Sequence, residues 1–251
     1  LHPRVRRQRQ MCIRDRLNQL SQDDIKVLIG RGYYNIWAIE SVGMIYRKSS
    51  DGPAGFNSWV SAEAESKKTA WPTASLIGNS WSEKTAYTYG RVIGIEGNEL
   101  GLSGWTAPGV NLHRTPFTSR NYEYFSEDGI LTGKLAGNII RGAKNSNLYT
   151  FIKHWVASES GQNPADWNTW LTEQALRELY MKPFEIAVKE GGANGIMSCF
   201  SGIGPVWAGR NYALNQQILR GEWGFRGSMV TDWHLWYMDC LLYTSDAADE
   251  L

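Results

Sequence analysis

Residues 227–234 read GSMVTDWH, a short apolar run that ends in an acid beside an indole. The run over 228–231 predicts a buried strand with Asp232 and Trp233 at its carboxyl end. Other short apolar runs along the chain predict further strands, since turn residues or helical patterns separate them. These runs cover residues 42–46, 74–77, 106–112, 148–156 and 195–200.

Helical patterns lie between the predicted strands. Apolar residues recur at three-to-four spacing over 130–140 and over 171–180, which marks one face of a helix. The second helix, over 172–182, is expected to break or bend near Pro183, and a weaker helix covers 212–219. Strands alternating with helices of this length predict βαβ units, a parallel sheet and the α/β fold class.

The number of candidate strands favours a (β/α)8 TIM-barrel-like domain that is truncated before its last strands. The alternative is a doubly wound open sheet, which normally carries a glycine-rich phosphate turn after its first strand. Here SSDGPAGF at 49–56 follows the first strand, and SGIGPVWAG at 201–209 lacks the third glycine of such a turn. Neither segment favours a nucleotide-binding protein.

The two ends of the chain differ from its middle. RRQRQMCIRDR at 6–16 and CLLYTSDAADE at 240–250 can be encoded by opposite strands of one DNA stretch, which resembles a transposon end used in sequencing libraries. We therefore expect residues 1–16 and 240–251 to be non-native read-through, and residues 17–239 to be a partial (β/α) barrel. An incomplete barrel exposes apolar edges, so we expect the isolated chain to be unstable or inactive.

Charge and composition exclude several classes of protein. The net charge is +1; setting aside six arginines and one aspartate in 1–16 and three acids in 240–251 leaves −1 on residues 17–239. No basic surface for nucleic acid is implied, and no window approaches the roughly 18 apolar residues of a membrane span. Cys199 is the only cysteine of 17–239, so no disulfide framework is expected. The cytoplasm is the default location, and the oligomeric state stays open.

Polar side chains follow most of the predicted strands, where the loops of a parallel barrel converge on one face. The set combines carboxylates, arginines, a lysine and a histidine with an indole, which suits a polyhydroxylated ring: acids accept from hydroxyls, bases donate, and the indole covers the apolar sugar face. No His or Cys pair has metal-ligand spacing, so neither a metal nor a cofactor is expected. These strand-end residues are Asp51, Arg114, Arg120, Glu123, Lys153, His154, Phe200, Ser201, Asp232 and Trp233.

From about residue 17 to residue 233, the chain resembles the family 3 glycoside hydrolases, typified by bacterial β-glucosidases. The motifs that carry the resemblance are SSDGPAGF (49–56), NLHRTPFTSRNYEYFSED (111–128), FIKHW (151–155), RELYMKPFEIAVKEGG (177–192), IMSCF (196–200) and LRGEWGFRGSMVTDW (219–233).

The resemblance implies a role for each matching residue. Asp232 matches the catalytic nucleophile of a retaining mechanism, in which a covalent glycosyl-enzyme is then hydrolysed by water. Arg114 and Glu123 match supporting positions, and the acid/base Glu of such enzymes is expected outside this chain. The substrate-binding matches are Asp51, Arg120, Lys153, His154, Trp233 and Met197 of the IMSCF motif.

Three positions depart from the family pattern. Asn57 stands where Arg is frequent, Pro164 stands where another Arg is expected, and Phe200 replaces a Tyr common near the nucleophile. The N-acetylglucosaminidase branch is disfavoured, because KHWVASESG at 153–161 lacks its His-Asp loop. The expected function is exo-acting hydrolysis of terminal β-D-glucosyl residues from a β-glucoside or oligosaccharide. The alternatives are a β-xylosidase of the same family and a catalytically incomplete sugar-binding barrel.

Overall fold

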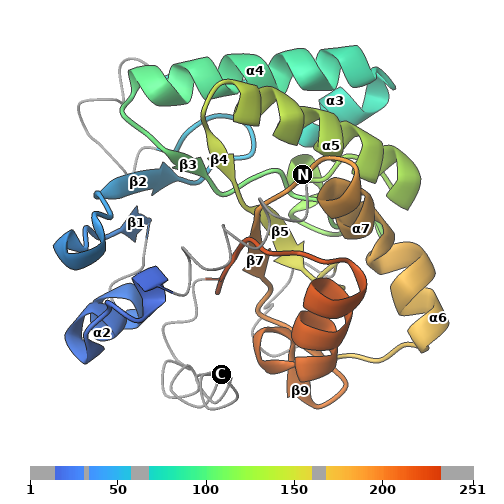
Figure 1. Cartoon of the computed structure of the whole chain (residues 1–251). Helices are drawn as coiled ribbons and strands as arrows, with labels where there is room; N and C mark the ends of the chain where they lie inside the picture. Colours follow the sequence, from blue (N-terminus) through green and yellow to red (C-terminus); the bar gives the residue numbers. More distant parts are fainter. Residues whose placement is uncertain (1–14, 31–33, 58–67, 160–167, 233–251) are drawn as a thin grey trace.

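The computed structural model describes residues 15–30, 34–57, 68–159 and 168–232, and it shows helices packed against short, mostly parallel strands (Figure 1). The first sheet has the strand order β1-β2-β3-β4, and only its β1–β2 pair is antiparallel. These strands are β1 (Asn35–Ile36), β2 (Arg47–Ser50), β3 (Gly104–Trp105) and β4 (Tyr149–Thr150).

The second sheet is wholly parallel and has the order β10-β7-β5. Its strands are β5 (Ile152–Trp155), β7 (Gly195–Ser198) and β10 (Ser228–Val230). Strands β4 and β5 come from one stretch of chain, and a parallel bridge from Gly109 to Lys153 sets the segment after β3 beside β5. The parallel strands of both sheets therefore run in the same direction, and their carboxyl ends face the same side of the molecule.

The third sheet is small. It contains β6 (Asn168–Thr169), β8 (Gly202–Ile203) and β9 (Val206–Trp207), and β8 and β9 form an antiparallel hairpin. Gly204 in the hairpin turn has a φ of +57°, a left-handed conformation that favours glycine.

Side-chain caps and packing define the helices. Ser82 accepts a hydrogen bond from the N–H of Thr85 at the start of α4, and Asp128 does the same for Ile130 and Leu131 at the start of α5. The α-helices are α2 (Gln22–Gly30), α3 (Ala74–Asn79), α4 (Glu83–Glu99), α5 (Gly129–Asn145), α6 (Glu173–Ala175) and α7 (Lys182–Lys189). The remaining helical segments are the 3₁₀ turns η1 (Glu40–Val42), η4 (Asn121–Glu123) and η7 (Ala208–Arg210) and the π-helices η6 (Leu176–Tyr180) and η8 (Ala213–Glu222).

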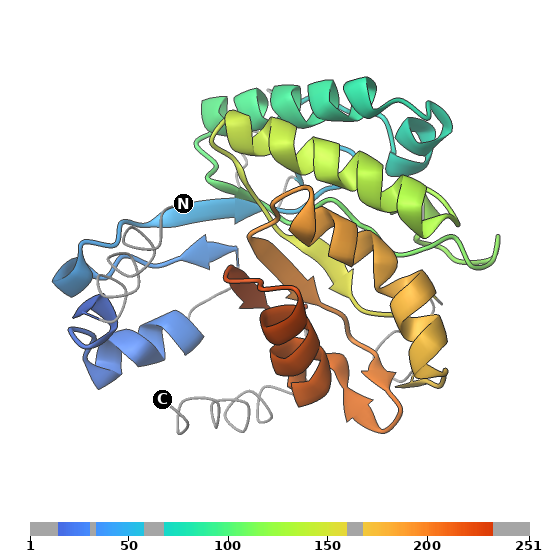
Figure 2. The ribbon, with the colours of Figure 1, turned by 45° about the vertical axis from the view of Figure 1, so that its right-hand side comes forward.

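Helices α4, α5 and α7 lie side by side along the strands (Figure 2). The α4–α5 contact depends on glycines: a methyl group on Gly90 would overlap the carbonyl oxygen of Ile139, and one on Gly142 would overlap that of Tyr87. Under α7 and η8 the fully buried Trp155 meets Phe184 and Trp223 edge to face, with ring centroids 5.2 and 5.3 Å away. None of the helices in the described part of the chain is long and apolar enough to cross a membrane.

Several predicted elements are confirmed. The strands expected over 148–156, 195–200 and 228–231 are β4 with β5, β7 and β10. The helices expected over 130–140 and 212–219 are α5 and η8, both longer than predicted. The helix expected over 172–182 is also present, and it is interrupted after Tyr180, so that Pro183 falls in the first turn of α7.

Other predictions were wrong. Residues 74–77 form α3 and not a strand, because the Thr73 side chain caps the segment and a short apolar run has no strand signal of its own. The strand expected over 42–46 is the polar β2 at 47–50, and the one over 106–112 is displaced to β3 at 104–105.

The fold class is α/β, but no closed barrel is found among the described residues, whose strands form three separate sheets. Of the proposed read-through segments 1–16 and 240–251, residues 1–14 and 240–251 lie outside the described residues.

Replacing Gly90 with alanine tests the close helix contact. The alanine methyl would push α4 away from α5, so we expect Gly90→Ala to lower the free energy of unfolding by about 1–3 kcal/mol, despite alanine's better helix propensity. Gly30→Ala is the matched control, because a methyl group at Gly30 meets nothing within 4 Å. Denaturant unfolding of both variants provides the measurement, and equal effects would show that the contact is not tight.

Candidate active site

A group of charged side chains meets where the parallel strands end. Asp51 directly follows β2, Lys153 and His154 belong to β5, and Asp232 follows β10. Lys153, His154 and Asp232 are each at most 5% exposed. Buried charges of this kind persist in proteins only when they are paired, so their contacts define the site.

Lys153 lies between two carboxylates. Its Nζ donates to Asp51 Oδ1 at 2.7 Å and lies 3.5 Å from Glu123 Oε2. Burial alone would raise the pKa of Asp51, but the Lys153 charge and hydrogen bonds from Lys153 and Thr106 hold it below its ordinary value. Burial would likewise lower the pKa of Lys153, yet the charges of Asp51 and Glu123 raise it. Asp51 and Lys153 are therefore both ionised at neutral pH.

Arg120 connects this group to the histidine. Its Nε forms a close ion pair with Glu123, and its Nη2 lies 2.7 Å from His154 Nε2. Burial would lower the pKa of Arg120, but neighbouring groups including Glu123 and Asp232 raise it above its ordinary value. A guanidinium group has only donors, so Nε2 of His154 must accept the hydrogen bond.

His154 is consequently a neutral ring. Burial, followed by the charges of Arg120 and Lys153, holds its pKa well below the ordinary value. With Nε2 as acceptor, the ring proton is on Nδ1, 3.2 Å from the Tyr124 hydroxyl. The 3.7 Å approach of Nε2 to Asp232 Oδ2 is thus no ion pair, and the positive charge that acts on Asp232 is that of Arg120.

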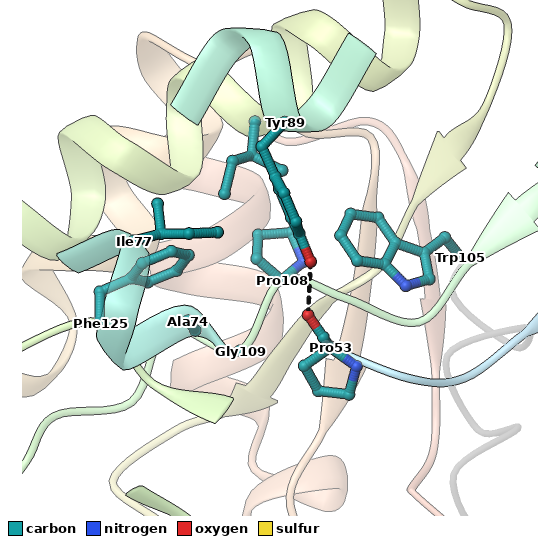
Figure 3. Close-up of a pocket in the computed structure, with 9 residues that line it drawn as sticks. Pro53, Ala74, Ile77, Tyr89, Trp105, Pro108, Gly109 and Phe125 are labelled. Carbon is teal, nitrogen blue, oxygen red and sulfur yellow. Dashed lines mark hydrogen bonds between the residues drawn. The ribbon is translucent and has the colours of Figure 1, made fainter. Parts of the chain in front are cut away.

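The loop that carries Asp51 is held from behind by two aromatic side chains. Trp105 Nε1 donates to the carbonyl of Gly52 at 2.9 Å, and the Tyr89 hydroxyl donates to that of Pro53 at 2.8 Å (Figure 3). Gly52 has a φ of +117°, which explains the glycine after Asp51. A small cavity beside these contacts is lined mainly by carbon surfaces, including those of Ala74, Ile77, Phe125 and Ile139. It belongs to the core that supports the loop.

Two further residues of the site were not predicted from the sequence. Asn111 bonds the backbone of His154 twice: Oδ1 accepts from the His154 N–H at 2.6 Å, and Nδ2 donates to the His154 carbonyl at 3.1 Å. Asn111 Nδ2 also donates to Oε1 of Glu159 at 3.2 Å. Glu159 is 2% exposed, and burial raises its pKa from an ordinary 4.5 to about 7. Asn111 opens the 111–128 motif, whereas the polar surroundings of Glu159 in the sequence gave no signal of burial.

The structure brings together most of the predicted site residues. Met197 lies in β7 opposite Val230 of β10 and is buried, but it has no recorded bond to the charged group. Arg114 is exposed and apart from that group, and its charge acts on Glu159. Trp233 lies outside the described residues. The residues that converge are Asp51, Arg120, Glu123, Lys153, His154 and Asp232.

Two of the three positions that depart from the family pattern lie among the described residues. The Asn57 N–H donates to the Asp51 carbonyl at 2.8 Å and to Ser50 Oγ at 3.2 Å, so this residue helps to close the Asp51 loop. Phe200 is half-buried after β7, and Pro164 lies outside the described residues. Within the described ranges, no three or more His, Cys, Asp or Glu side chains are grouped so as to hold a metal ion.

The fold and the candidate site define an α/β domain with a cluster of buried charged side chains at the carboxyl ends of its parallel strands. The profile of the glycosyl hydrolase family 3 N terminal domain matches residues 60–248. The chain therefore belongs to glycosyl hydrolase family 3, as the motifs predict.

The relatives found are β-glucosidases. The chain is 33% identical to beta-glucosidase A of Butyrivibrio fibrisolvens over 89% of its length, and 35% identical to beta-glucosidase B of Emericella nidulans over 84%. It spans 28% and 25% of those proteins. Beta-glucosidase 3B from Thermotoga neapolitana, solved with α-D-glucose, is similar in structure: the TM-score is 0.75 at 32% identity, over 79% of this chain and 28% of that one.

Removing the cation between the carboxylates tests the electrostatic centre. Lys153→Met keeps the length of the side chain but leaves Asp51 and Glu123 facing each other, so we expect unfolding to require about 3–5 kcal/mol less at neutral pH. The loss should shrink in acid, where the carboxylates become protonated. Lys26→Met breaks the exposed Lys26–Asp23 pair and should change nothing measurable. Similar losses in both variants would contradict the assignment.

Glu159 should make stability depend on pH. A carboxyl group whose pKa is raised in the folded state stabilises the fold below its unfolded pKa, and this contribution is lost as the pH rises through the folded pKa. Between about pH 4.5 and about 7, wild type should therefore lose roughly 3 kcal/mol relative to Glu159→Gln. Urea unfolding at several pH values measures this difference in stability. A difference that does not change with pH would show that the pKa of Glu159 is not raised.

Proposed function

We propose that the protein to which this chain belongs is a retaining exo-β-glycosidase, a β-glucosidase, that hydrolyses terminal non-reducing β-D-glucosyl residues. The β-glucosidase relatives support the substrate class. The observation that carries the mechanism is the position of Asp232: it is buried at the end of β10, 3.7 Å from His154 Nε2 and under the charge of Arg120. A buried carboxylate stays ionised and nucleophilic only beside such a charge.

In the proposed reaction, a carboxylate oxygen of Asp232 attacks the anomeric carbon as the bond to the leaving oxygen breaks. Water then hydrolyses the glycosyl ester and returns the carboxylate. The leaving group needs a proton from a second carboxyl group about 5–5.5 Å away. Asp51 is unsuited to that role, because its lowered pKa leaves it without a proton at neutral pH. We propose that the acid/base residue belongs to a part of the protein outside this chain, which spans 28% of the length of its relative from Butyrivibrio fibrisolvens.

The other charged groups would hold the sugar. Asp51 is partly open, with 27% of its side chain exposed, and can accept from ring hydroxyls while Lys153 fixes it from behind. Arg120 is similarly open, at 27%, and can donate to a hydroxyl. Trp233 would cover the apolar sugar face, and Met197, Arg114 and Glu123 would support the pocket. We infer that the parallel strands of the first two sheets (β2, β3, β4, β5, β7 and β10) are part of a (β/α)8 barrel, with this site at their carboxyl ends.

Covalent trapping of the nucleophile tests the proposed function. The whole parent enzyme, treated with an activated 2-deoxy-2-fluoro-β-glucoside, should gain one fluoroglucosyl group on the peptide that contains Asp232. Asp232→Asn should remove both the label and at least about 10³-fold of kcat, whereas Asp23→Asn, on an exposed residue of α2, should change neither. A label on another residue would contradict the assignment of Asp232 as the nucleophile. Faster reaction with the matching xyloside would identify β-xylosides as the substrate class.

A further inference from the structure

We propose that Glu159 is a positioning residue of the candidate active site: its carboxyl group orders Asn111, which in turn holds the backbone of His154. The catalytic consequence rests on the proposed function, but the geometry can be tested without turnover. Asn111 bonds both Glu159 and the His154 backbone, and the His154 ring accepts from Arg120 and lies beside Asp232, so these contacts link Glu159 to the charged group.

The first step is the contact between Asn111 and His154. The two bonds from the Asn111 amide to the His154 N–H and carbonyl form a closed pair that fits only one orientation of the amide. They fix the backbone at the residue whose ring accepts from Arg120 and lies beside Asp232. A displaced His154 backbone would move the ring against both partners.

The second step is the contact between Glu159 and Asn111. One hydrogen of Asn111 Nδ2 is used by the His154 carbonyl, and Glu159 Oε1 accepts the other at 3.2 Å. The same oxygen lies 3.5 Å from the N–H of Leu112. Both donors are buried, and a buried donor without an acceptor is costly, so Glu159 completes the hydrogen bonding of the segment that carries Asn111.

Glu159 is itself held in place by the neighbouring loop. Its backbone carbonyl accepts a hydrogen bond from Thr118 Oγ1 at 2.7 Å, two residues before Arg120. The carboxyl group therefore meets Asn111 from a fixed position, and both Asn111 and Thr118 are bonded to Glu159 in the segment after β5. Ordered outer contacts of this kind are what hold a catalytic group within the narrow tolerance that catalysis needs.

Few titratable groups face Glu159. The ones that act on it or respond to it are Arg114 and Tyr124 from the segment after β3, and Cys199 after β7. An arginine keeps its charge throughout, burial raises the pKa of Tyr124 well above its ordinary value, and burial raises the pKa of Cys199 to about 12. Glu159 is the member of this set that changes charge near neutral pH, since burial raises its pKa to about 7.

A change of charge on Glu159 alters its strength as an acceptor, because an ionised carboxylate accepts more strongly than a neutral one. The Asn111 amide and the His154 backbone should respond to that change. His154 can report it cleanly, because its own pKa lies well below the ordinary value and its ring stays neutral at these pH values. In the ¹⁵N-histidine-labelled parent enzyme, the ring signals that disappear in His154→Gln identify this residue.

The experiment follows the ring nitrogens of ¹⁵N-histidine-labelled protein by NMR between pH 5.5 and about 8.5, a window centred near the Glu159 pKa of about 7. The wild-type His154 signals should shift with a midpoint of about 7. Glu159→Gln keeps an acceptor but cannot ionise, so the transition should vanish. Glu159→Ala removes the acceptor and should displace the His154 signals at every pH. Glu99→Gln, the same change on an exposed residue of α4, should behave as wild type.

A transition that persists in Glu159→Gln, or unmoved His154 signals in Glu159→Ala, would overturn the proposal. If the variants fail to fold, wild-type protein labelled at the glutamate δ-carbon gives a second test: the Glu159 carboxyl and His154 ring signals must share one midpoint, and separate midpoints would refute the link. In the parent enzyme, the limb of the kcat/KM profile near pH 7 should disappear in Glu159→Gln. An enzyme without glycosidase activity would refute the proposed function and leave the NMR result standing.

Discussion

The buried ammonium group of Lys153 is the contact on which the site depends. It pairs with Asp51, which lies 102 residues earlier in the chain, and with Glu123 from η4. Burial disfavours the charged forms of Asp51 and Lys153, and their opposite charges offset that effect. The ends of β2 and β5 and the turn η4 must therefore meet at one point, which is a constraint on the fold as much as on the chemistry.

From Lys153 the charges alternate outward to the proposed nucleophile. Glu123 pairs with both Lys153 and Arg120, and Arg120 donates to His154. Burial, with the charges of Arg120 and Lys153, keeps the His154 ring neutral, so the guanidinium group supplies the charge near Asp232. A protonated histidine at the same place would add a second cation and depend on pH. The observed order gives Asp232 a permanent counter-charge.

The sequence predicted the parts of this arrangement that depend on residue type. The apolar runs at 195–200 and 228–231 became β7 and β10, and the charged motif residues other than Arg114 converge as expected. The strand predicted over 74–77 was wrong, because a short apolar run suits a helix as well as a strand and tertiary contacts decide between them. β2 was missed because RKSS carries no apolar pattern and forms a strand through its pairing with β1 and β3. Asn111 and Glu159 act on backbone groups, which no residue pattern reveals.

The carboxylate of Asp51 shows how the core and the site are linked. Its loop needs positive φ angles at Gly52 and Gly55, and the carbonyls of Gly52 and Pro53 are bound by Trp105 and Tyr89. Tyr89 comes from α4, whose position depends on the glycine contact with α5. A shift of α4 would therefore move the Asp51 loop through the Tyr89–Pro53 hydrogen bond, and it would disturb Lys153 through the Lys153–Asp51 bond. Since a buried ion pair tolerates little displacement, the close packing of these two helices is a requirement of the charged site and not only of the core.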